Sequence, residues 1–99
     1  MTKAMRLSEL QALTPELHQV LDRFGASNLA VFGSVARNQA EDESDVDLLV
    51  DLPAGCSLFT HADLKLAIED LLQRRVDLIR RRNLKGSLRQ RVEAEAIAL

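Results

Sequence analysis

Two aspartates, Asp45 and Asp47, stand two residues apart in an apolar run and are the clearest candidates for chemistry in the sequence. Because the side chains of a β-strand alternate between two faces, both carboxylates would leave the sheet on one face, about 7 Å apart, while Val46 and Leu48 enter the core. Neighbouring ionised carboxylates repel each other unless a cation lies between them. Carboxylate oxygens suit Mg²⁺, which also binds substrate phosphates. The pair therefore predicts a metal site that accepts a nucleotide.

A candidate phosphate-binding turn precedes the aspartates. Gly33 and Ser34 follow the apolar run 29–32, which we interpret as a buried strand, and they begin a segment that we expect to be a short helix. Glycine lets the backbone come close to a ligand, and amides at the start of a helix point at phosphate oxygens. Ser34 adds a hydroxyl donor. Arg37, about one turn further on, carries a planar guanidinium that suits phosphate.

A third acid, Asp77, lies in the middle of the apolar run Val76–Ile79, which predicts a short strand. A carboxylate within an apolar strand is costly unless it is paired or bound to a metal, so Asp77 is the best candidate for a third metal ligand. The alternative is an ion pair with Arg74, Arg75 or Arg80.

The elements that must position these residues follow from periodicity and capping. Leu17, Val20, Leu21 and Phe24 fall on one helical face, and Gly25 follows as a stop signal. Further amphipathic helices are expected after Ser57 and from Leu88 to Leu99. The order helix, strand, short helix, strand, helix, strand, helix predicts an α/β fold with a three-stranded mixed sheet and helices mainly on one face.

The combined pattern carries a resemblance. Gly33-Ser34, ten intervening residues and Asp45-x-Asp47, with Ala36-Arg37 and Ser44 in place, resemble the signature of the nucleotidyltransferase superfamily that includes DNA polymerase β. The short chain is most similar to the minimal nucleotidyltransferase (MNT) branch, the antitoxins of HEPN/MNT toxin–antitoxin pairs. This family usually has glycine after its arginine. Here Asn38 stands there, and asparagine is the next most tolerant residue for a left-handed backbone.

The resemblance, from about residue 17 to the C-terminus, implies a polymerase β-like fold and transfer of AMP from ATP to a hydroxyl of a cognate HEPN ribonuclease toxin. The acceptor would typically be a tyrosine, and the modification would neutralise the toxin. The implied mechanism uses two Mg²⁺ ions held by Asp45, Asp47 and Asp77. It also implies that Gly33, Ser34 and Arg37 bind the phosphates of the nucleotide. Ser44 would line the nucleotide site, either bracing its turn or touching the metal shell.

Composition fits one small domain spanning residues 1–99. With 46% apolar residues the chain can bury a single core. It has one cysteine, Cys56, and no apolar run of 18 residues, so we expect a cytoplasmic protein without disulfides or membrane contact. Cys56, His18 and His61 have no partners in sequence that would make them catalytic, and we interpret Cys56 as an incidental small residue and the two histidines as polar surface residues.

Charge is distributed unevenly along the chain. Residues 37–51 contain six acids and one base, whereas residues 74–91 contain eight bases and one acid. The acidic segment would bind cations, and the basic segment a polyanion or an acidic partner. Nucleic-acid binding is not expected, because the three aromatic residues, Phe24, Phe32 and Phe59, are better placed in a core than as stacking platforms.

Two alternatives to toxin modification remain open from sequence. The chain could be an antitoxin that neutralises its toxin by binding alone, or a stand-alone nucleotidyltransferase acting on another acceptor. A further expectation concerns the carboxylate face of the sheet, which also carries Leu49 and Ile79. Because no residues are left over to build a covering domain, we expect a partner protein to cover this face.

Overall fold

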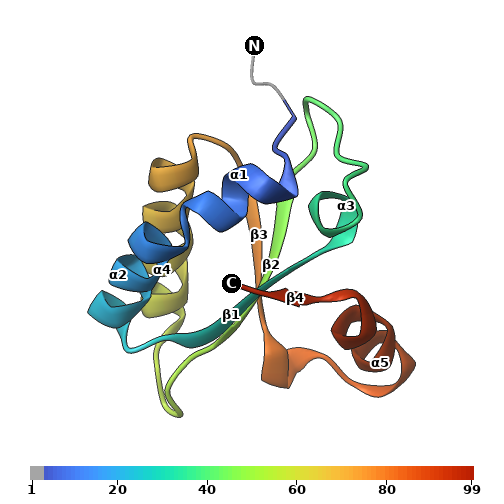
Figure 1. Ribbon diagram of the computed structural model, residues 1–99. Helices are drawn as coiled ribbons and strands as arrows, with labels where there is room; N and C mark the ends of the chain where they lie inside the picture. The colour runs from blue at the N-terminus through green and yellow to red at the C-terminus, as the bar shows by residue number, and fades with distance from the viewer. Residues whose placement is uncertain (1–3) are drawn as a thin grey trace.

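The computed structural model describes residues 4–99, so the first three residues of the predicted domain lie outside the described part. The chain forms a mixed sheet in the strand order β3-β2-β1-β4 (Figure 1). The strands are β1 (Ser27–Phe32), β2 (Val46–Asp51), β3 (Val76–Arg80) and β4 (Ile97–Ala98). The helices are α1 (Leu7–Ala12), α2 (Thr14–Phe24), α3 (Gly33–Ala36), α4 (Leu58–Leu72) and α5 (Gly86–Glu95), with a 3₁₀ turn at Arg81–Asn83.

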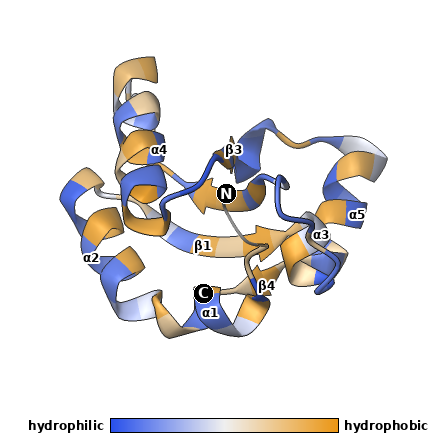
Figure 2. Cartoon of the chain, turned by 90° about the horizontal axis from the view of Figure 1, so that it is seen from above, coloured by the Kyte–Doolittle hydropathy of each residue, from blue (hydrophilic) through white to orange (hydrophobic). Residues whose placement is uncertain are grey.

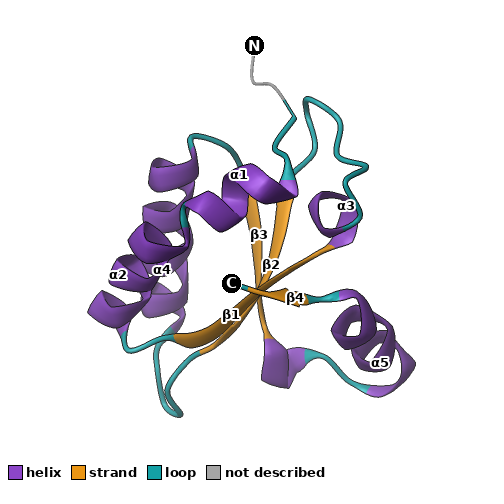
Figure 3. Cartoon of the chain, in the orientation of Figure 1, coloured by secondary structure: helices purple, strands orange, loops and turns teal. Residues whose placement is uncertain are grey.

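The mixed sheet is as predicted, with one strand more. Strands β1 and β2 are antiparallel, and β3 is parallel to β2, which requires the crossover through α4. The fourth strand, β4, pairs with the free edge of β1. It forms because α5 ends at Glu95 and the chain then extends, so the expected helix to Leu99 is wrong in its last turn. Figure 3 shows this short strand next to the C-terminus.

Helices α1, α2 and α4 cover one face of the sheet and enclose the main core (Figure 1). Helix α2 has Pro15 in its first turn and ends at Gly25 in the left-handed conformation, φ 67°. Helix α4 begins at Ser57, whose hydroxyl accepts a hydrogen bond from the amide of Thr60. Apolar and polar residues alternate around α2 and α4 (Figure 2), so both helices turn an apolar stripe towards the strands.

The chain itself covers the apolar part of the opposite, carboxylate face of the sheet, so the expectation that Leu49 and Ile79 need a partner to cover them is wrong. Leu49 is fully buried there and packs in a second core with Ala30, Leu84 and Val92, the last of which lies on α5. Ile79 packs against the same cluster. The ten residues of α5 and the preceding turn are enough to cover these side chains, because the strands present only a short apolar strip on this face. What remains open is the end of the sheet that carries the aspartates.

Within residues 4–99, no helix is both long and apolar enough to cross a membrane.

Candidate active site

Gly33 is held in a conformation and a space that only glycine fits. It follows β1 as the first residue of α3 and has φ 72°, in the left-handed region, and its neighbour Phe32 pairs with Asp47 on β2. A Cβ at Gly33 would overlap a carboxyl oxygen of Asp47 and would lie 3.0 Å from its Cγ. The turn therefore lies directly against the carboxylate, with no side chain between them.

Strand register sets Asp47 beside Asp77. The two residues are direct partners in the parallel β2–β3 ladder, so their side chains leave the sheet on the same face. Adjacent strands are about 4.8 Å apart, so two carboxylates in this arrangement share one site. The structure thus brings together Gly33, Asp47 and Asp77, three of the residues singled out from sequence.

Asp45 lies just before the strand rather than in it, since β2 begins at Val46. Its carboxylate forms an ion pair with Arg75, Oδ1 to Nε 3.3 Å, and about half of its side chain is exposed. Asp45 still lies near enough to act on the charge of Asp47. Its side chain would have to leave Arg75 to join Asp47 and Asp77 around one ion.

The electrostatics of Asp47 are those of a crowded carboxylate. Burial, with smaller contributions from the negative charges of Asp77 and Asp45, raises the pKa of Asp47 from its ordinary 3.8 to about 6. Arg37 acts in the opposite direction, whereas Glu95 adds to the rise. Among the described residues, the negative charges that act on Asp47 therefore outweigh the positive charge of Arg37.

A divalent cation fits this set of donors. Asp47 and Asp77 lie together at one end of the sheet with Asp45 close by, and part of the rise in the pKa of Asp47 is repulsion by these two acids that a cation would remove. The site is not preassembled, because within residues 4–99 no three carboxylate, imidazole or thiol groups are arranged to hold a metal ion. The carboxylate of Asp45, which would be the third ligand, pairs with Arg75 instead.

Ser34 and Asn38 lie in the segment that follows Gly33, and Ser44 lies in the loop before β2. Ser34 is the second residue of α3, and its carbonyl accepts a hydrogen bond from the amide of Gln39, 2.8 Å. Asn38 adopts the left-handed conformation expected of it, φ 55°. The hydroxyl of Ser44 accepts a hydrogen bond from the amide of Glu41, 3.0 Å, so Ser44 braces the loop before β2.

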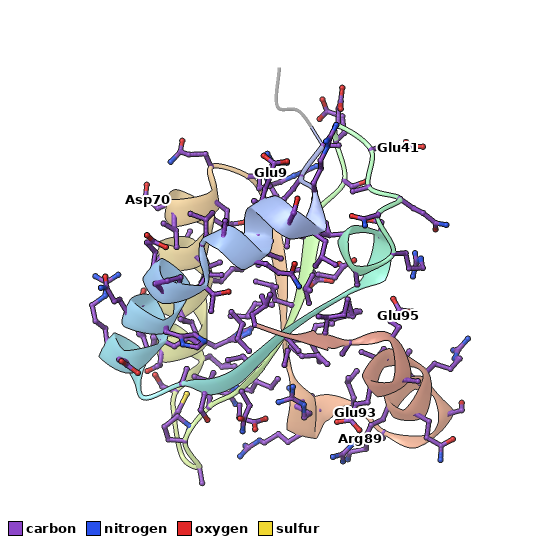
Figure 4. The ribbon with its side chains drawn as sticks, in the orientation of Figure 1. Glu9, Glu41, Asp70, Arg89, Glu93 and Glu95 are labelled. Carbon is purple, nitrogen blue, oxygen red and sulfur yellow. The ribbon has the colours of Figure 1, made fainter. Side chains whose placement is uncertain are left out.

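Glu95 was missed by the sequence reasoning. Its Oε1 accepts a hydrogen bond from the amide of Gly33, 2.5 Å, and one from Nη1 of Arg37, 2.7 Å. Glu95 lies at the end of α5, on the side facing α3 (Figure 4). The amide and guanidinium proposed for phosphate binding therefore converge on one point, and a carboxylate oxygen stands there. The only signal in the sequence is an acid at the end of the last helix, which by itself does not point to the turn.

Several titratable residues lie outside the site, as expected. Asp51 accepts hydrogen bonds from Asn28, 2.8 Å, and Arg81, 2.9 Å, and both contacts hold the pKa of Asp51 below its ordinary value. The ring of His18 bonds to the carbonyl of Leu99, and that of His61 to the carbonyl of Leu78. These contacts are structural.

The crowding of Asp47 makes a prediction about stability. Its pKa is about 6 in the folded chain and near 3.8 when unfolded, so between these values the unfolded state loses its proton first. The folded state is therefore penalised as pH rises through this window, and the penalty is complete above pH 6. We expect Asp47→Asn to stabilise the metal-free protein by about 1 kcal/mol at pH 8, since solvent screens this half-buried group, and to have little effect at pH 4.

Asp51→Asn is the matched control, because Asp51 lies at the other end of the same strand and its pKa is lowered. Its contribution to stability is present at neutral pH and is lost as pH falls through the acid range, so this variant should be less stable than the parent at pH 8. Urea unfolding of the three proteins at pH 4 and pH 8 measures both effects. Equal stability of Asp47→Asn and the parent at pH 8 would show that the ionised Asp47 carboxylate does not destabilise the folded protein.

Comparison with known proteins agrees with this fold and site. A family model described as the nucleotidyltransferase domain matches residues 17–99. The chain therefore belongs to the nucleotidyltransferase family. It is similar to the protein adenylyltransferase MntA of Thermococcus cleftensis, with 36% identity over 94 residues that span 94% of this chain and 95% of that protein. Its enzyme class is accordingly that of the protein adenylyltransferases.

Solved structures show the same fold. One, described as a minimal nucleotidyltransferase, has 46% identity and a TM-score of 0.83, covering 96% of this chain and 97% of that one. A toxin–antitoxin structure with AMP-PNP has 20% identity and a TM-score of 0.72, covering 85% of this chain and 69% of that one. The predicted α/β nucleotidyltransferase fold with a mixed sheet is confirmed.

Proposed function

We propose that this nucleotidyltransferase is an antitoxin that transfers AMP from ATP to a hydroxyl, typically a tyrosine, of a cognate HEPN ribonuclease toxin and so neutralises it. The observation that carries the proposal is the register that sets Asp47 beside Asp77 and against the turn at Gly33. The similarity to the adenylyltransferase MntA and the toxin–antitoxin assembly of a structural relative support the acceptor. The chain contains no tyrosine, so it cannot be its own tyrosine acceptor.

In the proposed reaction the acceptor oxygen forms a bond to the α-phosphorus of ATP, the bond from that phosphorus to the β-phosphate oxygen breaks, and pyrophosphate leaves. Two Mg²⁺ ions, held by Asp45, Asp47 and Asp77, would supply activation of the hydroxyl and stabilisation of charge on the phosphates. The Gly33 amide and the Arg37 guanidinium would hold the outer phosphates, so that the leaving group lies in line. Ser34 adds a hydroxyl beside them.

The test is to incubate the protein, ATP labelled at the α-phosphate, Mg²⁺ and a HEPN protein encoded beside it. We expect label on the HEPN protein and loss of its ribonuclease activity, with no label when ATP is replaced by the other three triphosphates or when EDTA is present. Neutralisation without label would instead indicate an antitoxin that acts by binding alone. Label on a different acceptor would indicate a stand-alone transferase.

A further inference from the structure

The Glu95 carboxylate is bound in the manner of a phosphate oxygen. A single oxygen accepts a hydrogen bond from a backbone amide, Gly33, and another from an arginine side chain, Arg37, at 2.5 and 2.7 Å. Short hydrogen bonds between charged groups are among the stronger ones in proteins, and amide plus guanidinium is a common set of donors for phosphate. Two of the donors proposed for an outer phosphate of ATP, the Gly33 amide and Nη1 of Arg37, are thus already in use.

Glu95 occupies this point against local repulsion. It lies close enough to Asp47 for its charge to act on that carboxylate, and Asp77 and Asp45 act on Asp47 as well. A fourth acid at an acidic site is unfavourable unless specific donors compensate, and Gly33 and Arg37 are the donors to it. Its contact is therefore a specific one, and it is reversible because a third of the side chain is exposed.

The backbone around Glu95 is anchored, so the side chain can leave without unfolding the helix. Glu95 is the last residue of α5, and the chain continues directly into β4. Strand β4 pairs with β1, and the amide of Leu99 donates to the carbonyl of Leu29, 2.9 Å. Rotation of one glutamate side chain then frees both donors.

We propose that Glu95 is an internal competitor for the nucleotide: its carboxylate fills the position of an outer phosphate, and ATP binds after this side chain has rotated away. The inference rests on the proposed nucleotide site. As a consequence, Arg37 and the Gly33 turn stay ordered in the site without nucleotide, and the protein binds ATP more weakly than it would without Glu95. The apparent affinity for ATP is the intrinsic affinity multiplied by the fraction of time for which the position is free.

Three variants separate occupation of the site from a general effect of charge. Glu95→Ala removes the competitor. Glu95→Asp keeps the charge but is shorter by one methylene, about 1.5 Å, so its oxygen would lie about 4 Å from the Gly33 amide and could not bond to it. Glu93→Ala removes an acid from the same helix that pairs with Arg81 and Arg89, away from the turn (Figure 4).

The measurement is the affinity for a fluorescent, non-hydrolysable ATP analogue in Mg²⁺, without any toxin present. If Glu95 occupies its position nine-tenths of the time, Glu95→Ala should bind about tenfold more tightly. Glu95→Asp should approach Glu95→Ala, and Glu93→Ala should stay within about twofold of the parent. A Glu95→Asp variant that binds like the parent while Glu95→Ala binds more tightly would overturn the proposal, since charge alone would then explain the gain.

A second readout does not depend on nucleotide. The amide proton of Gly33 in the ligand-free protein should resonate downfield in the parent and in Glu93→Ala, and should shift upfield in both Glu95 variants. Identical Gly33 resonances in all four proteins would contradict the contact. Failure of parent and variants alike to bind the analogue would overturn the nucleotide site and the inference together. Tighter binding by the Glu95 variants without AMP transfer to the HEPN protein would leave the inference standing and reject only the acceptor.

Discussion

Replacing Asp47 by asparagine is expected to reduce AMP transfer to the HEPN toxin by about a thousandfold or more, while the protein stays folded. Asp47 is the carboxylate that lies against the Gly33 turn and pairs in register with Asp77, so it lies between the proposed phosphate-binding turn and the second acid. Stabilisation of phosphate charge by bound metal is worth several kcal/mol, and about 1.4 kcal/mol corresponds to a factor of ten in rate. An amide keeps the shape of the side chain but not the negative charge that a cation needs.

The same substitution should make the metal-free protein more stable above pH 6, as argued from the raised pKa of Asp47. Opposite effects on stability and on activity distinguish a functional carboxylate from a structural one, because loss of a structural group lowers both. Transfer of label from ATP, measured beside urea unfolding of the same preparation, gives both quantities. Asp51→Asn is the control again, since Asp51 is engaged by Asn28 and Arg81 and should support transfer within about twofold of the parent.

Two outcomes would oppose this assignment. Full transfer activity in Asp47→Asn would show that the carboxylate is not needed for chemistry. Equal losses in Asp47→Asn and Asp51→Asn would show that transfer responds to any loss of charge on β2.

Asp77→Asn should reproduce the loss seen with Asp47→Asn, because strand pairing places the two carboxylates at one site.

Much of this arrangement follows from local rules. A period of two predicts that Asp47 leaves the sheet on the face opposite Val46 and Leu48, and glycine after an apolar strand predicts a tight turn at Gly33. The apolar run around Asp77 predicts a strand, and the parallel ladder then puts Asp77 opposite Asp47. These features depend on residue type and spacing over a few positions, which is why the sequence is informative about them.

The features that the sequence did not reveal depend on contacts between distant segments. Glu95 lies 62 residues from Gly33, and it reaches the turn only because α5 stops there and the chain turns into β4. The cover over Leu49 depends on the same helix folding back across the sheet. The pairing of Asp45 with Arg75 depends on where β2 starts, and strand boundaries shift by a residue or two without changing the hydrophobic pattern.

Gly33→Ala is expected to destabilise the protein by about 2–5 kcal/mol and to abolish binding of the ATP analogue. Part of the cost, about 1–2 kcal/mol, comes from placing a Cβ at a positive φ. The rest comes from overlap of that Cβ with the Asp47 carboxyl, and overpacking of this kind costs about 1–3 kcal/mol. The shift that relieves the overlap must move the turn or the carboxylate, and both belong to the proposed nucleotide site.

Gly55→Ala isolates the backbone part of this cost. Gly55 also has a positive φ, 82°, but no atom lies within 4 Å of a Cβ built there, so its substitution should cost only about 1–2 kcal/mol and leave nucleotide binding unchanged. Combining Gly33→Ala with Asp47→Ala removes the overlapping carboxyl, so the added cost of the Gly33 substitution should fall to that of Gly55→Ala. Urea unfolding of the two single variants and the double variant, with Asp47→Ala as reference, gives this coupling energy. A Gly33→Ala cost that is the same with and without the Asp47 side chain would mean that the turn can move away from the carboxylate, and the close approach on which the site depends would then be lost.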